Sequence, residues 1–411
     1  MTLMEFLNQI SLVSFIVLLL SSSTTILNPV NAAESCNFPA IFNLGASNSD
    51  TGGLGAAFGE LKSPKSPNGE TYFHRPSGRF SDGRIILDFI AESFGLPHVH
   101  SYLNSLGANY SQGANFATYS STIRIPESIV PNGKFSPFSL GVQVAQLKDF
   151  IPNTKFIRSQ GGIFATLMPK EEYFSKALYT FDIGQNDLTA GFVSKGLPHL
   201  VRASVPDIVN TFSAHIKDIY NLGARSFWIH NTGPIGCFPF ILTTFKVTLK
   251  DRYGCSKPHN EVAQYFNQKL KEAVVQLRQE LPQAAITYVD VYSIKYSFVS
   301  DPKKYGFEQP LVACCGNGGF YNFNNKVSCG GTMDNGNHVG ACEKPSTRPI
   351  WDGIHYTEAA NKIVFDQISS GAFTDPPIPL NMSCQRTNSS IRENLHHVKL
   401  NKQGFGLYHV T

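Results

Sequence analysis

Apolar residues fall into two patterns that alternate along the chain. Short uninterrupted apolar runs that end at glycine or at polar residues predict buried β-strands. Longer segments repeat an apolar residue every three or four positions, which is the spacing of one helix face. The predicted strands are 39–44, 114–118, 178–183, 226–229 and 285–291, and the predicted helices are 84–94, 208–222, 261–281 and 356–370.

This alternation predicts an α/β fold with a mostly parallel sheet that helices cover on both faces. In such sheets the ligand site lies beyond the carboxyl ends of the strands. Three segments rich in glycine, proline, serine or asparagine interrupt the pattern at 62–79, 122–137 and 301–349, and we expect loops there. The third segment is also rich in cysteine, so we interpret it as a disulfide-stapled insertion before the last helix.

The composition is that of an ordinary globular protein. Hydrophobic residues make up 42% of the 411-residue chain and charged residues 16%, which suits one α/β domain with insertions. The formal net charge is +4, and the basic residues are scattered, with no Lys/Arg run longer than two. The sequence therefore predicts no nucleic-acid partner and no polybasic membrane patch.

The N-terminus has the pattern of a secretory signal peptide. An apolar run at 11–20 precedes a Ser/Thr-rich stretch and then the small residues at 31–33, where we expect cleavage. The segment before the run departs from the pattern, because it contains Glu5 and no Lys or Arg. An uncleaved anchor is the alternative, but the run is short for a bilayer and no other long apolar run follows. We therefore predict a secreted protein, extracellular or in the cell wall, without a membrane span.

Eight cysteines favour an oxidising compartment. A zinc site in the cluster at 314–342, with His338 nearby, is the alternative for four of them. Their irregular gaps do not match paired C-x2-C knuckles, so we expect local disulfides instead. The expected pairs are Cys237–Cys255, Cys36–Cys384 and two bridges among Cys314, Cys315, Cys329 and Cys342.

These patterns divide the chain into three parts. Residues 1–33 are the predicted signal peptide, 34–380 a single domain with the Cys-rich insertion at about 301–349, and 381–411 a polar C-terminal tail. Sequons for N-linked glycans agree with secretion. They begin at Asn109, Asn381 and Asn388.

Two polar residues follow predicted strands at positions suited to chemistry. Ser47 lies just past the first strand among small residues, where a tight turn can present its hydroxyl and its own N–H to a ligand. A plain Ser/Gly turn is the alternative. Asn186 follows the strand 178–183, where its amide can donate to a developing oxyanion. An Asx turn or a helix cap is the alternative there.

Asp352 and His355 stand three residues apart just before the last predicted helix. In a turn, the carboxylate can accept from Nδ1 of the imidazole and leave Nε2 free to act as a base. A serine hydroxyl needs such a base before it becomes a good nucleophile. The alternative is a surface loop with unrelated polar residues, since the chain holds 12 histidines.

Taken together, these segments resemble the plant GDSL esterase/lipases of the SGNH hydrolase superfamily, and most of all their legume early-nodulin branch. The resemblance implies a flavodoxin-like three-layer α/β/α sandwich. It also implies Ser47 as nucleophile, His355 as general base, Asp352 as its orienting partner, and Asn186 with the Ser47 N–H as oxyanion donors. The matching motifs are FPAIFN at 38–43, SNSDTGG at 47–53, GANFA at 113–117, GQND at 184–187 and DGIHYTE at 352–358.

Two positions depart from the family pattern. Ala46 replaces the aspartate of the Gly-Asp-Ser triplet, which could loosen the turn that aims Ser47. Tyr119 and Ser120 stand where relatives usually carry a glycine whose N–H serves the oxyanion hole. Ser120 retains an N–H, but Tyr119 could crowd the site and a glycine-only backbone angle would be lost.

We therefore predict a secreted carboxylic ester hydrolase that acts on small acyl or acetyl esters, including glycan or specialised-metabolite esters, with no cofactor and no metal. The alternatives are a catalytically weak or inactive relative that binds cell-wall carbohydrate, and an acyltransferase. Glycosidase chemistry needs a pair of carboxylates, and we can assign no such pair in the sequence.

Overall fold

A six-stranded sheet forms the centre of the computed structural model, which describes residues 35–59, 63–130, 132, 134–384 and 386. The strand order is β2-β1-β3-β4-β5-β6. The first five strands are parallel, and β6 runs antiparallel to β5. The strands are β1 (Ile41–Gly45), β2 (Gly113–Asn115), β3 (Leu178–Asp182), β4 (Ser226–His230), β5 (Ala285–Val289) and β6 (Thr374–Asp375).

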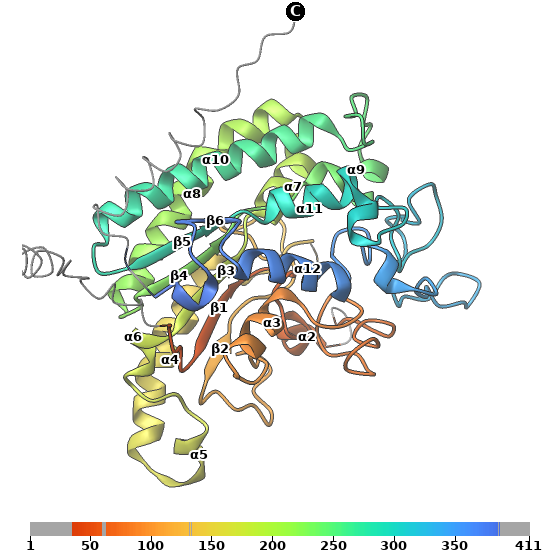
Figure 1. Cartoon of the computed structure of the whole chain (residues 1–411). Coiled ribbons are helices and arrows are strands. Elements are labelled where there is room, and N and C mark those ends of the chain that lie inside the picture. The colour runs from red at the N-terminus through yellow and green to blue at the C-terminus, as the bar shows by residue number, and fades with distance from the viewer. Residues whose placement is uncertain (1–34, 60–62, 131, 133, 385, 387–411) are drawn as a thin grey trace, which may run out of the picture. The chain divides into compact units, whose positions relative to one another are not determined.

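Helices cover the sheet on both faces, and Figure 1 shows α8 and α10 side by side on one of them. On that face α8 also contacts α4, whereas on the other α12 contacts α3 and α11. This order and layering are those of the flavodoxin-like doubly wound fold, which confirms the predicted fold class. The helices are α2 (Gly53–Phe58), α3 (Ile86–Ser93), α4 (Leu140–Ser159), α5 (Gly162–Thr166), α6 (Tyr173–Lys176), α7 (Gln185–Lys195), α8 (Pro198–Asn221), α9 (Pro239–Thr244), α10 (Lys257–Glu280), α11 (Val291–Ser300) and α12 (Glu358–Ser369).

Burial follows the two apolar patterns of the sequence. Every residue of β1, β4 and β5 is buried, because helices lie on both faces of the central strands. Among the residues that the inner face of α10 buries are four large apolar side chains at helical spacing, while its outer face is polar. These four are Phe266, Leu270, Val274 and Leu277.

Several predicted boundaries were wrong, and several helices, including α4, α7 and α11, were not predicted. Helix α8 begins at Pro198, ten residues earlier than the predicted 208, because Pro198 is accommodated in the first turn and Val201 and Val205 extend the buried stripe beyond Pro206. Strand β5 ends at Val289, and α11 follows it where we predicted none. The 20-residue helix α4 was missed entirely. Thr357 caps α12 by accepting the N–H of Ala360.

Disulfides form in the expected arrangement. Within the insertion, Cys314 pairs with Cys342 and Cys315 with Cys329, which leaves no thiolate for the zinc alternative. The other two pairs are Cys237–Cys255 and Cys36–Cys384. The predicted signal peptide, Asn388 and most of the predicted tail lie outside the described residues.

Asn109 and Asn381 are both exposed at the surface, as N-glycosylation would require. Across the part of the chain that the structure covers, no helix combines the length and apolar character needed to cross a bilayer.

Candidate active site

Ser47 lies in a turn directly after β1, and the residue is 3% exposed. Gln143 of α4 fixes the end of β1. Its Oε1 accepts the Gly45 N–H at 2.8 Å, and its Nε2 donates to the Gly45 carbonyl at 2.9 Å. A Cβ on Gly45 would lie 2.8 Å from the carbonyl oxygen of Asp182. Only glycine therefore allows the turn to pack this closely against β3.

Asp182, the last residue of β3, holds both neighbours of Ser47. Its carbonyl accepts the Ala46 N–H at 2.9 Å, and its carboxylate accepts the Asn48 amide at 3.3 Å. The turn is closed on itself by the Ser49 N–H, which donates to the Ala46 carbonyl at 3.0 Å. These bonds fix the backbone around Ser47 without the aspartate side chain that Ala46 lacks.

The carboxylate of Asp182 belongs to a buried polar cluster under the turn. His230 Nδ1 lies 3.3 Å from the second carboxylate oxygen. Trp228 Nε1 donates to His230 Nε2 at 3.1 Å, so His230 carries its proton on Nδ1 and donates to Asp182. Burial acts to raise the pKa of Asp182, but the His230 hydrogen bond and the nearby charge of Lys295 outweigh it and lower the pKa. Asp182 is therefore a carboxylate at neutral pH.

Asp352 and His355 form a direct pair in the loop before α12. His355 Nδ1 lies 2.7 Å from Asp352 Oδ2, while Oδ1 accepts the N–H groups of Ile354 at 3.1 Å and His355 at 2.9 Å. Burial acts to raise the pKa of Asp352, but the His355 imidazole and these N–H groups lower it overall. Gly353 enables the turn, because its φ of 98° is rarely accessible to other residues.

The second imidazole nitrogen is positioned as a base. His355 is 2% exposed, and its Nε2 is buried with no hydrogen-bond partner among the described residues. Two aromatic rings flank the imidazole: Phe80 at 5.3 Å and Tyr119 at 6.0 Å between ring centroids. Phe80 and Tyr119 stack on each other at 4.3 Å, so Tyr119 forms part of the wall beside His355. Burial and the charge of Asp352 raise the pKa of Tyr119 to about 12.

Asp50 joins the Ser47 loop to the segment that contains Ser120. Its buried carboxylate accepts the N–H groups of Gly52 at 2.8 Å, Gly53 at 2.6 Å and Tyr119 at 2.6 Å. Ser120 has a φ of 65°. The left-handed backbone that glycine provides in relatives is therefore retained by a serine, against our expectation, at an energetic cost. The Ser120 N–H has no acceptor within the described part of the chain, and neither has the Ser47 N–H.

Asn186 lies in the first turn of α7, next to the same segment. Its amide donates to the Ser121 carbonyl at 2.9 Å. Asp187 accepts the N–H groups of Ile123 at 2.8 Å and Arg124 at 3.1 Å, and burial raises the pKa of Asp187 to about 6. Asn186 is thus bonded to the residue that follows Ser120.

Four of the five residues predicted from the sequence lie in loops and Asn186 lies in the first turn of α7. Hydrogen bonds and ring contacts connect these segments. Asp352 and His355 are the pair in direct contact; no hydrogen bond joins the Ser47 hydroxyl to His355 in the described structure. Catalytic hydrogen bonds are often long without substrate and tighten when it binds. The residues that hold the Ser47 turn were not predicted from the sequence. Asp182 and His230 could have been noticed, because each is a polar residue at the end of a buried strand. Gln143 and Phe80 gave no such signal.

Comparison with known proteins identifies the family of the chain. Residues 41–368 match the family of GDSL-like lipases/acylhydrolases. The chain is 61% identical over 389 residues to a Medicago truncatula protein named GDSL esterase/lipase ENOD8, covering 94% of this chain and 99% of that one. It is 58% identical over 387 residues to a Hevea brasiliensis protein named Esterase, covering 93% and 96%. An Arabidopsis thaliana protein named Alpha-L-fucosidase 3 is 49% identical over 351 residues, covering 84% and 94%. The chain therefore belongs to the GDSL-like lipase/acylhydrolase family of ester-hydrolysing serine hydrolases.

Proposed function

We propose that the protein is a secreted carboxylic ester hydrolase that acts on small acyl or acetyl esters through Ser47, His355 and Asp352. One observation carries the proposal. The buried His355 imidazole is bound by Asp352 at 2.7 Å on one nitrogen, while the other has no partner among the described residues. An imidazole held in this way can take the proton of a serine hydroxyl.

In this proposal, Ser47 Oγ attacks the ester carbonyl carbon while its proton passes to His355 Nε2. The negative charge on the carbonyl oxygen is stabilised by the N–H groups of Ser47 and Ser120 and by the second amide hydrogen of Asn186. His355 then gives its proton to the leaving alcohol, and an acyl-enzyme remains on Ser47. Water attacks the acyl-enzyme with His355 again as base, which releases the carboxylic acid and restores the serine.

The Arabidopsis thaliana relative is named as a fucosidase, which is a glycosidase. Glycosidase activity needs two carboxyl groups that flank the scissile bond. Near Ser47, the carboxylate of Asp50 is occupied by backbone N–H groups and that of Asp182 by His230 and Asn48. Asp352 is occupied by His355. These engaged carboxylates favour ester chemistry over glycoside chemistry.

The disulfides and the exposed Asn109 support the proposed secretion, because disulfides and N-glycans are typical of extracellular proteins. The esterase proposal is tested by p-nitrophenyl acetate hydrolysis with the purified, glycosylated protein and a Ser47→Ala variant. We expect clear turnover by the wild type and none above background by the variant. Equal rates for the two proteins would refute the proposal.

A further inference from the structure

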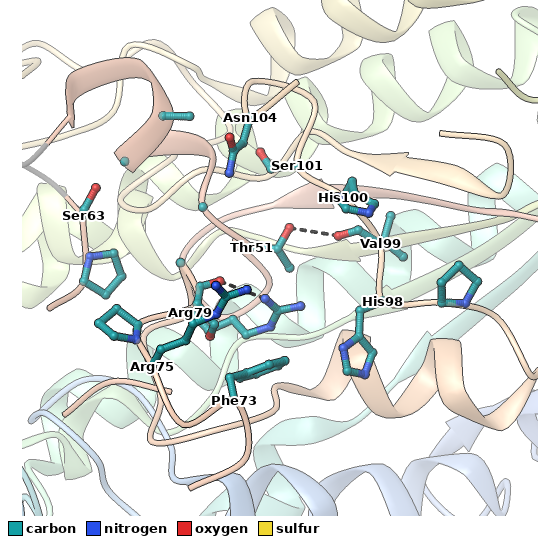
Figure 2. A pocket seen from close by; sticks show the side chains of 18 residues that line it. Thr51, Ser63, Phe73, Arg75, Arg79, His98, Val99, His100, Ser101 and Asn104 are labelled. Carbon is teal, nitrogen blue, oxygen red and sulfur yellow. Dashed lines mark hydrogen bonds between the residues drawn. The ribbon is translucent and has the colours of Figure 1, made fainter. Parts of the chain in front are cut away.

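Two aromatic rings, those of Phe80 and Tyr119, flank the imidazole of His355. Their centroids lie 5.3 and 6.0 Å from that of the imidazole, and they are its ring contacts among the described residues. Phe80 directly follows Arg79, which lines a pocket of about 690 Å³ (Figure 2). Neither Phe80, Tyr119 nor any of the five candidate catalytic residues lines that pocket. The Phe80 ring is therefore directed to the His355 loop and not to the pocket.

Tyr119 is held at its backbone and at its ring. Its N–H donates to the carboxylate of Asp50 at 2.6 Å, and its ring stacks on Phe80 with 4.3 Å between the centroids and an interplanar angle of 27°. The Tyr119 hydroxyl has no hydrogen-bond partner among the described residues, so ring packing alone positions the side chain. The two rings therefore form one stacked pair beside the proposed base.

This stacked pair offers accessible surface next to reacting groups that are themselves enclosed. Ser47 is 3% exposed and His355 2%, whereas Phe80 and Tyr119 are only partly buried. In the proposed mechanism His355 Nε2 gives its proton to the leaving alcohol, so the alcohol oxygen must come within about 2.6–3.2 Å of this nitrogen. A group attached to that oxygen therefore lies near the two rings that flank the imidazole.

We propose that Phe80 and Tyr119 form a stacking platform for a flat ring in the alcohol portion of the ester, so that esters of aryl or benzyl-type alcohols are the preferred substrates. The inference deepens the proposed esterase function and rests on it. Aromatic rings attract one another in offset-stacked or edge-to-face geometry beyond the area that they bury, and a saturated ring of the same size lacks this attraction. Tyr119 is the ring to test, because Asp50 fixes its backbone independently of its side chain.

The test compares kcat/KM for benzyl acetate and cyclohexylmethyl acetate, measured by titrating the released acetic acid at constant pH. Both are acetates of primary alcohols with a six-membered ring, and their intrinsic difference cancels when the ratio is compared between variants. Tyr119→Leu keeps much of the bulk but removes the ring, so we expect the benzyl-to-cyclohexylmethyl ratio to fall about two- to tenfold. Tyr119→Phe keeps the ring and should keep the wild-type ratio. So should the control Phe156→Ala, which removes an aromatic side chain of α4 that is 65% exposed.

A second pair of esters assigns the effect to the alcohol side. Ethyl phenylacetate and ethyl cyclohexylacetate carry the same two rings in the acyl portion, and their ratio should not change in Tyr119→Leu. The melting temperature monitors folding, and Tyr119→Ala is a second variant with the same expected fall in the first ratio. An unchanged first ratio in both folded variants, an equal fall in Tyr119→Phe, or an equal fall in the acyl-side ratio overturns the inference while the esterase function stands. No hydrolysis of any of the four esters by the wild type refutes the proposed function, and the inference with it.

Discussion

The turn that carries Ser47 and the loop that carries His355 are held by different parts of the molecule. The Ser47 turn is bonded to the sheet and its covering helix, through Asp182 of β3 and Gln143 of α4. The His355 loop is bonded to the insertion instead, because Cys314 N–H donates to the Ile350 carbonyl at 3.0 Å and Cys315 N–H to the Trp351 carbonyl at 2.7 Å. Both cysteines are in disulfides. The proposed nucleophile is therefore positioned by the fold, and the proposed base by an insertion that disulfides stabilise.

The largest effect is expected within the base loop itself. Asp352→Asn removes the carboxylate that orients His355, and the corresponding change in serine hydrolases lowers kcat about 10⁴-fold because the imidazole adopts the wrong tautomer. We expect a loss of that order for p-nitrophenyl acetate. Asp366→Asn, at an exposed position of α12, is the matched control and should keep wild-type kcat. A loss below about tenfold would remove Asp352 from the mechanism.

The disulfides of the insertion should matter to rate, unlike the one that joins the ends of the domain. Replacing Cys315 and Cys329 by serine loosens the segment that binds Trp351, and a 1 Å displacement of a catalytic group can cost about 10²-fold in rate. We expect kcat to fall by up to that factor. The double variant of Cys36 and Cys384 should lower the free energy of unfolding by about 2–4 kcal/mol with kcat unchanged. Equal kcat values for the two double variants would contradict the comparison.

A smaller effect is expected from the polar cluster under the Ser47 turn. Asp182→Asn keeps the shape and the backbone bond to Ala46, but an amide cannot accept from both Asn48 and His230. We expect kcat to fall about tenfold with KM unchanged, since only the position of the nucleophile changes. Asp290→Asn, just after β5, is the matched control. It should leave both kcat and the melting temperature nearly unchanged, because an asparagine at this position still accepts the Ser293 N–H and caps α11.

The smallest effect is expected at Ser120, between the two regions. Ser120→Gly relieves the φ of 65° and keeps the N–H, so kcat should stay unchanged. The free energy of unfolding, measured by urea denaturation, should change by less than about 1 kcal/mol, because the relieved strain offsets the lost hydrogen bond from Ser120 Oγ to the Lys134 carbonyl at 3.1 Å. Ser121→Gly, the neighbouring control, removes a hydroxyl that donates to the Phe138 carbonyl at 2.8 Å and should destabilise the protein. A fall in stability for Ser120→Gly as large as that for Ser121→Gly would show that Ser120 is not strained.

The sequence predicted the fold where local pattern and burial agree. The central strands and α10 have apolar patterns that burial on one or two faces explains. Helix α4 was missed because its pattern is blurred: the polar Gln143 is fully buried, whereas Phe156 is exposed. Gln143 is buried because it binds Gly45, a contact that no local pattern reveals.

The candidate site was predictable to the extent that its residues follow strands or precede a helix. Ser47, Asn186, Asp352 and His355 could be named because short motifs carry them. The support around them comes from residues far apart in the sequence, such as Asn48 with Asp182 and Trp351 with Asn68. Such long-range contacts depend on how the strands and loops pack, so only the structure revealed them.

The central claim is that Ser47 is a nucleophile activated by His355. Labelling with a fluorophosphonate, followed by mass spectrometry of the peptides, tests it most directly, because the reagent forms a covalent bond with activated serines. The account predicts one adduct on Ser47, absent in Ser47→Ala and strongly reduced in Asp352→Asn. The absence of any adduct on the folded wild-type protein, or an adduct on a different serine, would contradict it.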